Sequence, residues 1–448
     1  MQRRHLLGHL GSWTAAAWLH PTTSHAQERY APYRGQTVRM SIPTHPHYDA
    51  MRKLLPAFTR ETGIRVDTDP QPLPEMKRLQ LAEMQKDSCD FDLVCYVAMW
   101  KGEYVKRGLI RPLAPYLENA AFTPTDFDLK DIVPGYLENI GLVGGWKGYL
   151  AGGSAQLYGL PYGAETSILA YRKDLFDAHQ IAPPSTYFEL ERMLPRLREK
   201  TGLGALTSRG KAGHQCVHAW LLHLNPIGGK IFENNWTPRF NDASGVRALN
   251  LLRQVMETGP AGALDFDQSA MMNAFLQGQA TMYLDSTIVF GAVRDATKSR
   301  VDGKVAYARH PKGSRHSAQS GGLGLAIPQK ARNPDAAFLL LQWLTAKAQD
   351  KAVAELGGAP QRQSTLADAA LLARFPEFSV LRHSINDADP NWRPIIPPWD
   401  EINTEVLGAA VHQVLQGKSA AQPALDKAAM AVAAIMRREG YLVGAAHH

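Results

Sequence analysis

The sequence predicts an α/β protein of two lobes, whose mostly parallel sheets carry helices on both faces. The first observation is length, because 448 residues exceed the roughly 250–300 that one hydrophobic core usually supports. The second is the alternation of short apolar strands with amphipathic helices, which is typical of parallel sheets covered by helices. The composition, 45% hydrophobic and 20% charged, is that of a globular protein with a sizeable core.

The elements follow one another along the chain in a regular order. Strands are expected at residues 37–43, 64–66, 91–97, 166–171, 281–284 and 324–327. Helices are expected at 48–63, 74–86, 100–107, 174–179, 185–200, 334–357 and 423–439. Gly63 and Gly440 end the first and the last of these helices. Residues 141–163 are rich in glycine and poor in periodicity, so loops and turns are expected there.

The N-terminus reads as an export signal. Arg3 and Arg4 give a positive start, a modestly apolar stretch follows, and Ser24 to Ala26 place small residues where a signal peptidase cuts. We expect residues 1–26 to be a signal peptide of the Sec or Tat pathway and the mature, soluble chain to begin near Gln27 in the periplasm. No later stretch has the 18 apolar residues of a membrane span.

The charge distribution gives no sign of nucleic-acid binding, and the cysteines give no sign of a disulfide or a CxxC site. The net charge is +7, and 47 − 42 = +5 without residues 1–26, spread along the chain with no basic, aromatic-rich run for a nucleic acid. Cys89, Cys95 and Cys216 form no CxxC pair, and the first two are too far apart along an extended strand for a disulfide. Free, mostly buried thiols are expected.

No motif for a nucleophile, a phosphate loop, a dinucleotide turn or a zinc helix is present. His45 and His47 with Asp49 lack a further distant ligand, so no metal site is predicted. The sequence therefore predicts neither catalytic residues nor a cofactor.

Five segments together resemble the extracellular solute-binding protein family 1, which serves ABC importers and includes the maltose-binding proteins. In the family's order they are LPYGAETSILAYRKDLF (160–176), AFLQGQATMYLDST (274–287), GGLGLAIPQKARNPDAAFLLLQWLTAKAQ (321–349), GGAPQRQS (357–364) and RPIIPPWDEIN (393–403). The resemblance covers nearly all of the chain after residue 26.

The resemblance implies a type II periplasmic-binding-protein fold with discontinuous lobes joined by a hinge. Lobe one is expected at 27–164 plus 283–332, and lobe two at 165–282 plus 333–448. It also implies a monomer that is not an enzyme, that closes on a sugar or sugar alcohol, and that delivers it to the transmembrane subunits of an ABC permease.

A sugar site needs charged or amide groups for directional hydrogen bonds and aromatic rings against C–H faces, on loops at the carboxyl ends of parallel strands. The residues expected to contact ligand on these grounds or through the resemblance are Thr44, His47, Tyr96, Trp100, Tyr162, Glu165, Trp220, Asp285, Gly322 and Arg362. Leu323 departs from the family's pattern, which often has tryptophan there.

Three alternatives stay open at this stage. The same scaffold would bind an acidic or phosphorylated sugar or another anion through Arg362 and His47. A periplasmic carbohydrate-active hydrolase or lyase would use Glu165 and Asp285 as acid and base. A metal or metal-chelate receptor would use His45, His47 and a tyrosine.

Overall fold

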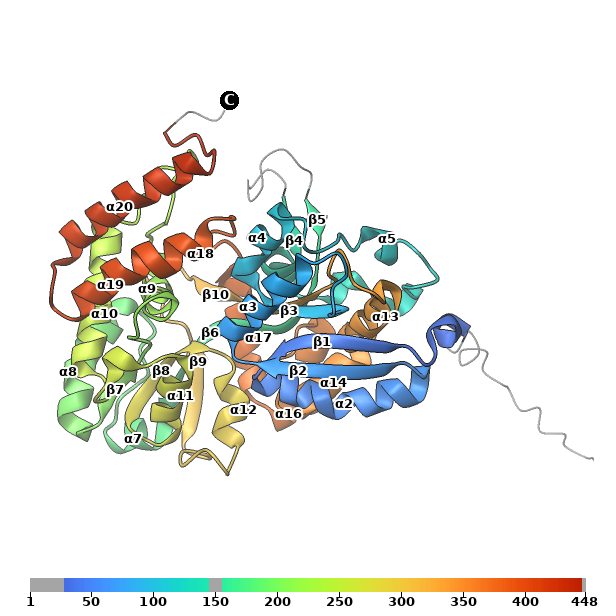
Figure 1. Ribbon diagram of the computed structural model, residues 1–448. Coiled ribbons are helices and arrows are strands. Elements are labelled where there is room, and N and C mark those ends of the chain that lie inside the picture. Colours follow the sequence, from blue (N-terminus) through green and yellow to red (C-terminus); the bar gives the residue numbers. More distant parts are fainter. Residues whose placement is uncertain (1–27, 145–154, 445–448) are drawn as a thin grey trace, which may run out of the picture.

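The structure is a computed structural model that describes residues 28–144 and 155–444. Two lobes lie side by side and are joined by strands that run from one into the other (Figure 1). The predicted signal peptide, residues 1–26, lies outside the described residues.

The sheet of lobe one has the order β2-β1-β3-β10-β6. Its strands are β1 (Thr37–Pro43), β2 (Arg65–Gln71), β3 (Leu93–Val97), β10 (Ala318–Ala326) and the first half of β6 (Leu160–Arg172). β1 is parallel to β2 and β3, whereas β10 is antiparallel to β3 and β6. The two short strands β4 (Leu142–Val143) and β5 (Gln156–Leu157) form a separate antiparallel pair.

β6 crosses from one lobe to the other and belongs to both sheets. Residues 160–166 pair with β10, and residues 167–172 pair with β8 (Ala280–Ser286) and β9 (Val305–Arg309). β7 (Gly204–Thr207) lies parallel to β8 and completes the second sheet. β11 (Ala388–Asp389) pairs with the start of β10, so a third segment passes the same junction.

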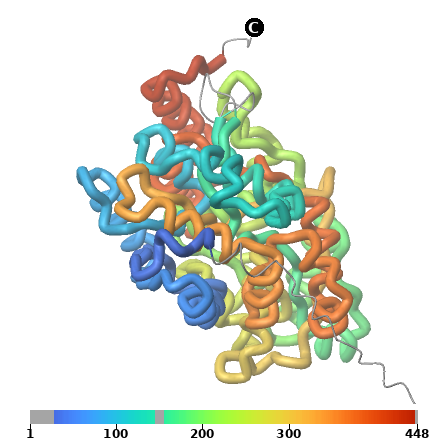
Figure 2. The backbone as a smooth tube through the Cα atoms, turned by 90° about the vertical axis from the view of Figure 1, so that its right-hand side faces the viewer, coloured from blue at the N-terminus to red at the C-terminus, as the bar shows by residue number. Residues whose placement is uncertain are grey.

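Lobe one is covered by helices from distant parts of the chain, which lie side by side in Figures 1 and 2. They are α2 (Pro46–Thr62), α3 (Leu73–Met84), η2 (Ala98–Trp100), α4 (Lys101–Lys106), α5 (Ala114–Leu117), α6 (Pro134–Tyr136), η5 (Leu137–Gly141), α13 (Pro334–Thr345) and α14 (Lys347–Glu355). α2 ends at Gly63, whose φ of 75° suits glycine, as the sequence predicted. Short 3-10 turns lie at η1 (Ala31–Tyr33), η3 (Thr125–Phe127) and η4 (Leu129–Asp131).

Lobe two is built largely from helices around β7 and β8. They are α7 (Lys173–Ala178), α8 (Tyr187–Thr201), α9 (His214–Ile227), α10 (Ala243–Thr258), η6 (Ala263–Asp265), α11 (Gln268–Leu276), α12 (Val289–Arg294), α18 (Trp399–Glu401), η7 (Ile402–Leu407), α19 (Gly408–Leu415) and α20 (Ala421–Arg438). Beside the junction lie α15 (Gln363–Leu366), α16 (Ala369–Arg374) and α17 (Glu377–Asp387).

Several predicted elements differ from the structure in extent. The expected loop at 141–163 ends early, because β6 begins at Leu160. The single helix expected over 334–357 is two helices, since Ala346 has the extended ψ of 159°. β10 begins at Ala318, before the predicted 324, and β2 continues to Gln71.

The pairings also divide the lobes at other places than predicted. β9, expected in lobe one, pairs with the second half of β6. α13 and α14, expected in lobe two, pack on α2, and α13 also packs on β3. β10 returns the chain to lobe one just before α13, and every residue from Ala336 to Thr345 is buried, so this helix fills the core beside that sheet.

The three cysteines are free and buried, as predicted. Burial raises the pKa of Cys89 to about 11 and that of Cys216 to about 12, and it raises the pKa of Cys95 further. These thiols therefore stay protonated near neutral pH.

A buried hydrogen-bond chain joins the crossing strands to lobe two. The Tyr187 hydroxyl donates its one proton to the carbonyl of Leu222 at 2.9 Å. Two histidine nitrogens also lie within hydrogen-bond distance of this hydroxyl oxygen, His310 Nε2 at 2.9 Å and His223 Nδ1 at 3.1 Å. Because the hydroxyl has no second proton, both nitrogens donate to its oxygen. His310 Nδ1 then accepts from Ser167 Oγ of β6 (2.9 Å). His310 has to be neutral in this arrangement, because its Nδ1 accepts a hydrogen bond.

We predict that the free energy of unfolding falls as pH falls from about 6.5 to about 4. Burial lowers the pKa of His223 and of His218 to about 4, and that of His310 and of His47 to about 3. Between the ordinary pKa of about 6.5 and these values the unfolded chain binds more protons, at a cost of ~1.4 kcal/mol per pH unit for each group. Thermal denaturation across this pH range measures the slope.

The matched variants are His223→Asn, which keeps a side-chain donor but cannot titrate, and His383→Asn at an exposed position. The first should flatten the dependence of melting temperature on pH, and the second should leave it unchanged. A melting temperature that is constant between pH 6.5 and 4 would contradict the assignment.

Candidate functional site

Two side chains of lobe two come at the carboxyl ends of neighbouring parallel strands. β7 and β8 are parallel, with Thr207 opposite Tyr283. Arg209 follows β7, and Asp285 is near the end of β8. Because such ends meet at one edge of a sheet, the two side chains lie together at the seam between the lobes.

Arg209 and Asp285 form a buried bidentate ion pair. Arg209 Nε donates to Asp285 Oδ2 at 2.8 Å, and Nη2 donates to Oδ1 at 2.5 Å. Burial alone would raise the pKa of Asp285, but the charge of Arg209 and the nearby His218 hold it well below its ordinary range. His218 Nε2 of α9 lies 3.5 Å from the same carboxylate. The pair presents a fixed guanidinium and carboxylate at the seam.

Gly321 of β10 lies among polar atoms from three segments. A β-carbon at this position would lie 3.6 Å from Trp392 Nε1, 3.7 Å from Arg393 Nη2 and 3.7 Å from Asn139 Oδ1. Neither the indole nitrogen nor the amide oxygen has a hydrogen-bond partner among the described residues. Unsatisfied buried groups of this kind are costly, so their convergence indicates a binding position.

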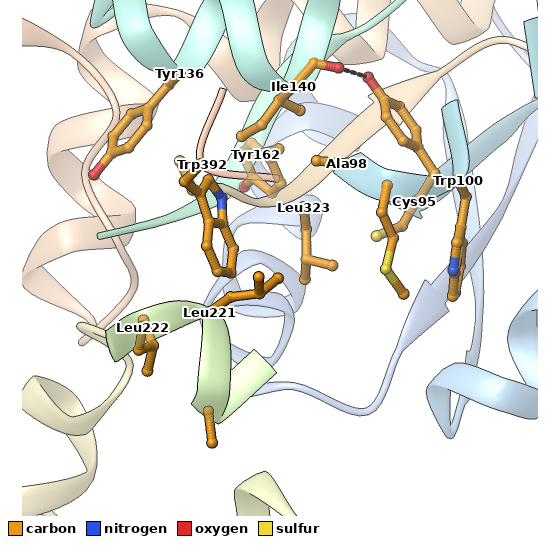
Figure 3. Packing of buried hydrophobic residues seen from close by; sticks show 14 of the residues in the cluster. Cys95, Ala98, Trp100, Tyr136, Ile140, Tyr162, Leu221, Leu222, Leu323 and Trp392 are labelled. Atoms are coloured by element: carbon orange, nitrogen blue, oxygen red, sulfur yellow. Dashed lines mark hydrogen bonds between the residues drawn. The ribbon is translucent and has the colours of Figure 1, made fainter. Parts of the chain in front are cut away.

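Trp392 and Arg393 lie in the third crossing segment, between β11 and α18. They are 2% and 3% exposed, and the guanidinium lies 4.7 Å from the centre of the indole. His218 contacts the same ring edge to face at 5.2 Å. In Figure 3, Leu323 lies between Trp392 and Trp100, and Leu221 of α9 lies below Trp392. Trp392 thus supplies an aromatic ring beside Leu323.

Arg393 is a buried cation whose Nε has no hydrogen-bond partner among the residues that the structure describes. Burial and the charge of Arg209 together lower its pKa to about 10, although Glu165 and Asp400 act in the opposite direction. Arg393 therefore stays protonated near neutral pH, and its buried Nε lacks an acceptor among the described residues.

Asn139 is positioned by a buried lysine. Lys101 Nζ donates to the carbonyl oxygens of Glu138 (3.2 Å) and Asn139 (2.6 Å) in the π-helical turn η5. Asn139 Nδ2 in turn donates to the carbonyl of Pro390 at 2.5 Å. These bonds attach lobe one to the third crossing segment and direct the free Oδ1 toward Gly321.

Glu165 lies at the midpoint of β6, opposite Gly321 in the antiparallel ladder. Its Oε1 is 3.4 Å from His45 Nε2, at the start of α2. Burial would raise the pKa of Glu165, but interactions with His45, Ser286 and Arg209 hold it below its ordinary value. Glu165 is therefore an ionised carboxylate between the two lobes.

These residues form what we call the seam cluster: Asn139, Glu165, Arg209, His218, Asp285, Trp392 and Arg393. Its two arginines and two carboxylates sum to +2 − 2 = 0, and His218, with a pKa of about 4, is neutral near pH 7. The cluster offers several donors and acceptors and one aromatic ring, with no net charge.

The structure places two of the predicted ligand residues, Glu165 and Asp285, in this cluster. Sequence reasoning gave no role to Asn139, Arg209, His218, Trp392 or Arg393. Arg393 begins a segment quoted for the family resemblance, which is the one sequence signal among these residues, and Trp392 directly precedes that segment. Arg209 and His218 carry no local signal, because their position follows from the packing of α9 and β7 against β8.

Three predicted ligand residues have other roles in the structure. Tyr96 donates to the carbonyl of Ile140 (2.7 Å), shown dashed in Figure 3, and Trp220 donates to that of Gly245 (3.2 Å). Both are fully buried core residues. The guanidinium of Arg362, which was expected to bind ligand, is bonded to the protein itself. It donates to the carbonyls of Thr345, Phe127 and Asp128 and forms an ion pair with Asp131.

The other predicted residues lie around the junction. Thr44 is exposed in the turn before α2. Trp100 is buried beside Tyr104, and the ring of Tyr162 lies 4.4 Å from that of His47. His47 accepts from the backbone N–H of Ala359 at 3.0 Å.

Gly322 was expected to let ligand approach the backbone, but it meets protein backbone instead. Its φ is 102°, and a β-carbon there would lie 2.5 Å from the carbonyl oxygen of Gly163. The glycine that faces the seam cluster is its neighbour, Gly321.

The geometry bears on two of the alternatives. A hydrolase needs a carboxylic acid whose pKa is raised, whereas the pKa values of Glu165 and Asp285 are both lowered. Among the described residues, no three histidine, cysteine or acidic side chains are placed to hold a metal ion.

Comparisons with known proteins show the family and the fold. The model of the family "Bacterial extracellular solute-binding protein" matches residues 43–351. A probable amino-acid ABC transporter periplasmic-binding protein of Sinorhizobium fredii is 25% identical over 427 residues, 92% of this chain and 91% of the relative. The mannitol-binding protein of Pseudomonas aeruginosa is 29% identical over 349 residues, 73% of this chain and 77% of the relative.

A solved structure shows the same fold. The solute-binding protein of Agrobacterium radiobacter in complex with ribitol has a TM-score of 0.80 and 27% sequence identity. The match covers 90% of this chain and 99% of that protein.

We predict opposite effects from alanine at the two adjacent glycines of β10. Gly321→Ala should leave the melting temperature nearly unchanged but weaken ligand binding at least tenfold, because its methyl group fits the protein at 3.6–3.7 Å and contacts the polar atoms that a ligand would use. Gly322→Ala should destabilise the fold by about 1–3 kcal/mol, because its positive φ and short backbone contact strain any side chain. Thermal denaturation and ligand titration separate the two effects, and equal effects of both variants would contradict this assignment.

Proposed function

This chain belongs to the bacterial extracellular solute-binding protein family, and on that premise we propose that it binds a neutral sugar or sugar alcohol in the seam cluster and delivers it to an ABC permease. The observation that carries the proposal is the convergence of buried, unpartnered polar groups on Gly321. Hydroxyl groups of a polyol would accept from Arg393 and Trp392 Nε1 and donate to Asn139 Oδ1.

The charge of the cluster supports a neutral ligand over an anion. Asp285 neutralises Arg209 by direct contact, and the charge of Glu165 opposes that of Arg393. A ligand with a net negative charge would leave the buried seam with an uncompensated charge. The indole of Trp392 gives the C–H face of a sugar or polyol an aromatic surface. Relatives with 29% and 27% identity bind mannitol and ribitol, respectively, which supports the same class.

Binding and release would use the three crossing segments. The cluster draws Asn139 from lobe one, Arg209, His218 and Asp285 from lobe two, and the remaining residues from the crossings. A ligand that contacts all three parts stabilises the closed arrangement of the lobes over the open one, because only the closed arrangement completes its hydrogen bonds. The membrane permease would distinguish loaded from empty protein by that difference in shape.

We propose further that residues 1–26 are a signal peptide and that the mature chain acts as a periplasmic monomer. The paired arginines, the apolar stretch and the Ser24–His25–Ala26 sequence support the signal. Within the described residues, no helix combines the length and hydropathy needed to cross a bilayer. Mass spectrometry of the exported protein would give the cleavage position.

We predict that purified residues 27–448 are stabilised by neutral sugar alcohols or sugars. The ligands to be tested are ribitol, mannitol and other neutral polyols and sugars, together with aldonic acids, polyol phosphates and amino acids. Thermal shift identifies the ligands that stabilise the protein, and calorimetry then measures their affinity. A ligand at a hundred times its Kd stabilises the folded chain by about 2.7 kcal/mol. Stabilisation only by anions or only by amino acids would overturn the neutral-polyol proposal.

The same titration tests the site. Trp392→Ala and Arg393→Gln should each weaken binding at least tenfold, since the unpartnered Trp392 Nε1 and the guanidinium Nη2 of Arg393 both lie at Gly321. Trp236→Ala, at a partly buried position in the turn before α10, should leave affinity unchanged. Unchanged affinity in both site variants would place the ligand elsewhere.

A further inference from the structure

Beside α4 and α18, the seam between the lobes is lined almost entirely by charged residues. A surface groove there contains Lys77, Glu103, Lys106, Arg107, Asp400, Glu401, Glu405 and Glu439, with Pro397, Pro398 and Thr404. The lobe-one side comes from α3 and α4, and the lobe-two side comes from α18, η7 and the residue after α20. Figure 1 shows α4 and α18 facing each other across the junction.

The charges are segregated by lobe. Lobe one contributes the cations Lys77, Lys106 and Arg107, with Glu103 among them. Lobe two contributes the carboxylates Asp400, Glu401, Glu405 and Glu439, with Arg438 bonded to two of them. The facing edges of the two lobes therefore attract each other.

Two ion pairs cross the groove. Lys77 Nζ lies 2.6 Å from Asp400 Oδ2, and it also contacts Glu103 of its own lobe at 3.0 Å. Lys106 Nζ lies 3.0 Å from Glu439 Oε2. The Lys77 side chain is only 14% exposed, so its pair is screened less than a typical surface pair.

The backbone holds these partners in position. A β-carbon at Gly102 of α4 would lie 3.1–3.3 Å from the backbone of residues 395–397, so α4 fits closely against the third crossing segment. α18 begins at Trp399, two residues after this segment, and packs on η2. The distance between the cations of lobe one and the carboxylates of lobe two therefore depends directly on how the lobes are placed.

We propose that Lys77–Asp400 and Lys106–Glu439 form an ionic latch that holds the two lobes closed. The latch makes the affinity for a neutral ligand depend on salt, because screening weakens closure and not the ligand contacts. It also sets how long the ligand stays bound, since the lobes separate only after both pairs break.

The latch also adjoins the seam cluster. The charge of Asp400, the partner of Lys77, acts on Arg393 of that cluster. Without Lys77, Asp400 would attract Arg393 away from the ligand. Lys106–Glu439 has no such connection, so its removal tests the latch alone.

The test is a double-mutant cycle on the outer pair, with Lys106→Met, Glu439→Gln and the double variant, titrated with the polyol that binds the unmodified protein. Each single variant should raise Kd roughly two- to fivefold, mainly through faster dissociation, and the double variant should cost no more than either one. The increase of Kd with sodium chloride should also become smaller in all three. Lys173→Met is the matched control, because its ion pair with Asp177 stays within α7.

A readout that does not depend on ligand identity separates this proposal from the proposed function. Small-angle X-ray scattering of the ligand-free chain measures its radius of gyration. This radius should be larger in the double variant Lys77→Met/Lys106→Met, and in the unmodified protein at high salt, than in the unmodified protein at low salt. An unchanged radius together with additive or absent effects on Kd would overturn the latch. Failure of every polyol to bind, with the radius still shifting, would overturn the proposed function and leave the latch standing.

Discussion

The strand β6 is hydrogen-bonded to β10 along its first half and to β8 and β9 along its second, so both sheets are built on one continuous segment. This constraint decides where the other functional parts lie. The change of partner occurs at Glu165 to Ser167, which places a carboxylate and a hydroxyl at the boundary between the lobes. Antiparallel pairing puts Gly321 opposite Glu165, and the close approach of the two backbones explains why Gly322 needs a positive φ.

The seam cluster depends on compensation of charge within a buried space. Arg209 and Asp285 satisfy each other and are fixed by two hydrogen bonds, whereas Arg393 is balanced only at a distance. The guanidinium of Arg209 is therefore structural, whereas that of Arg393 is available to a ligand. The same reasoning explains Arg362, which has protein acceptors on every side and contributes to stability.

Much of the fold could be predicted from the sequence because local patterns determine it: β1 was located to the residue, and glycines ended α2 and α20 where expected. The lobe boundaries could not, since α13 is apolar on every side and its pattern does not say which sheet it covers. Glu165 and Asp285 could be predicted as candidates because they end or cross strands, and both lie in the seam cluster. Tyr96, Trp220 and Arg362 were misplaced because aromatic and charged residues have the same local sequence signal whether their partner is a ligand or the protein itself.

The three buried thiols have a practical consequence. With pKa values raised to about 11 and above by burial, Cys89, Cys95 and Cys216 expose no thiolate to a labelling reagent at neutral pH. A single cysteine introduced on the rim of the groove between α4 and α18 would then be the one position that takes an environment-sensitive dye. The native chain is thus already a suitable background for a fluorescent reporter of lobe movement, without removal of any of its own cysteines.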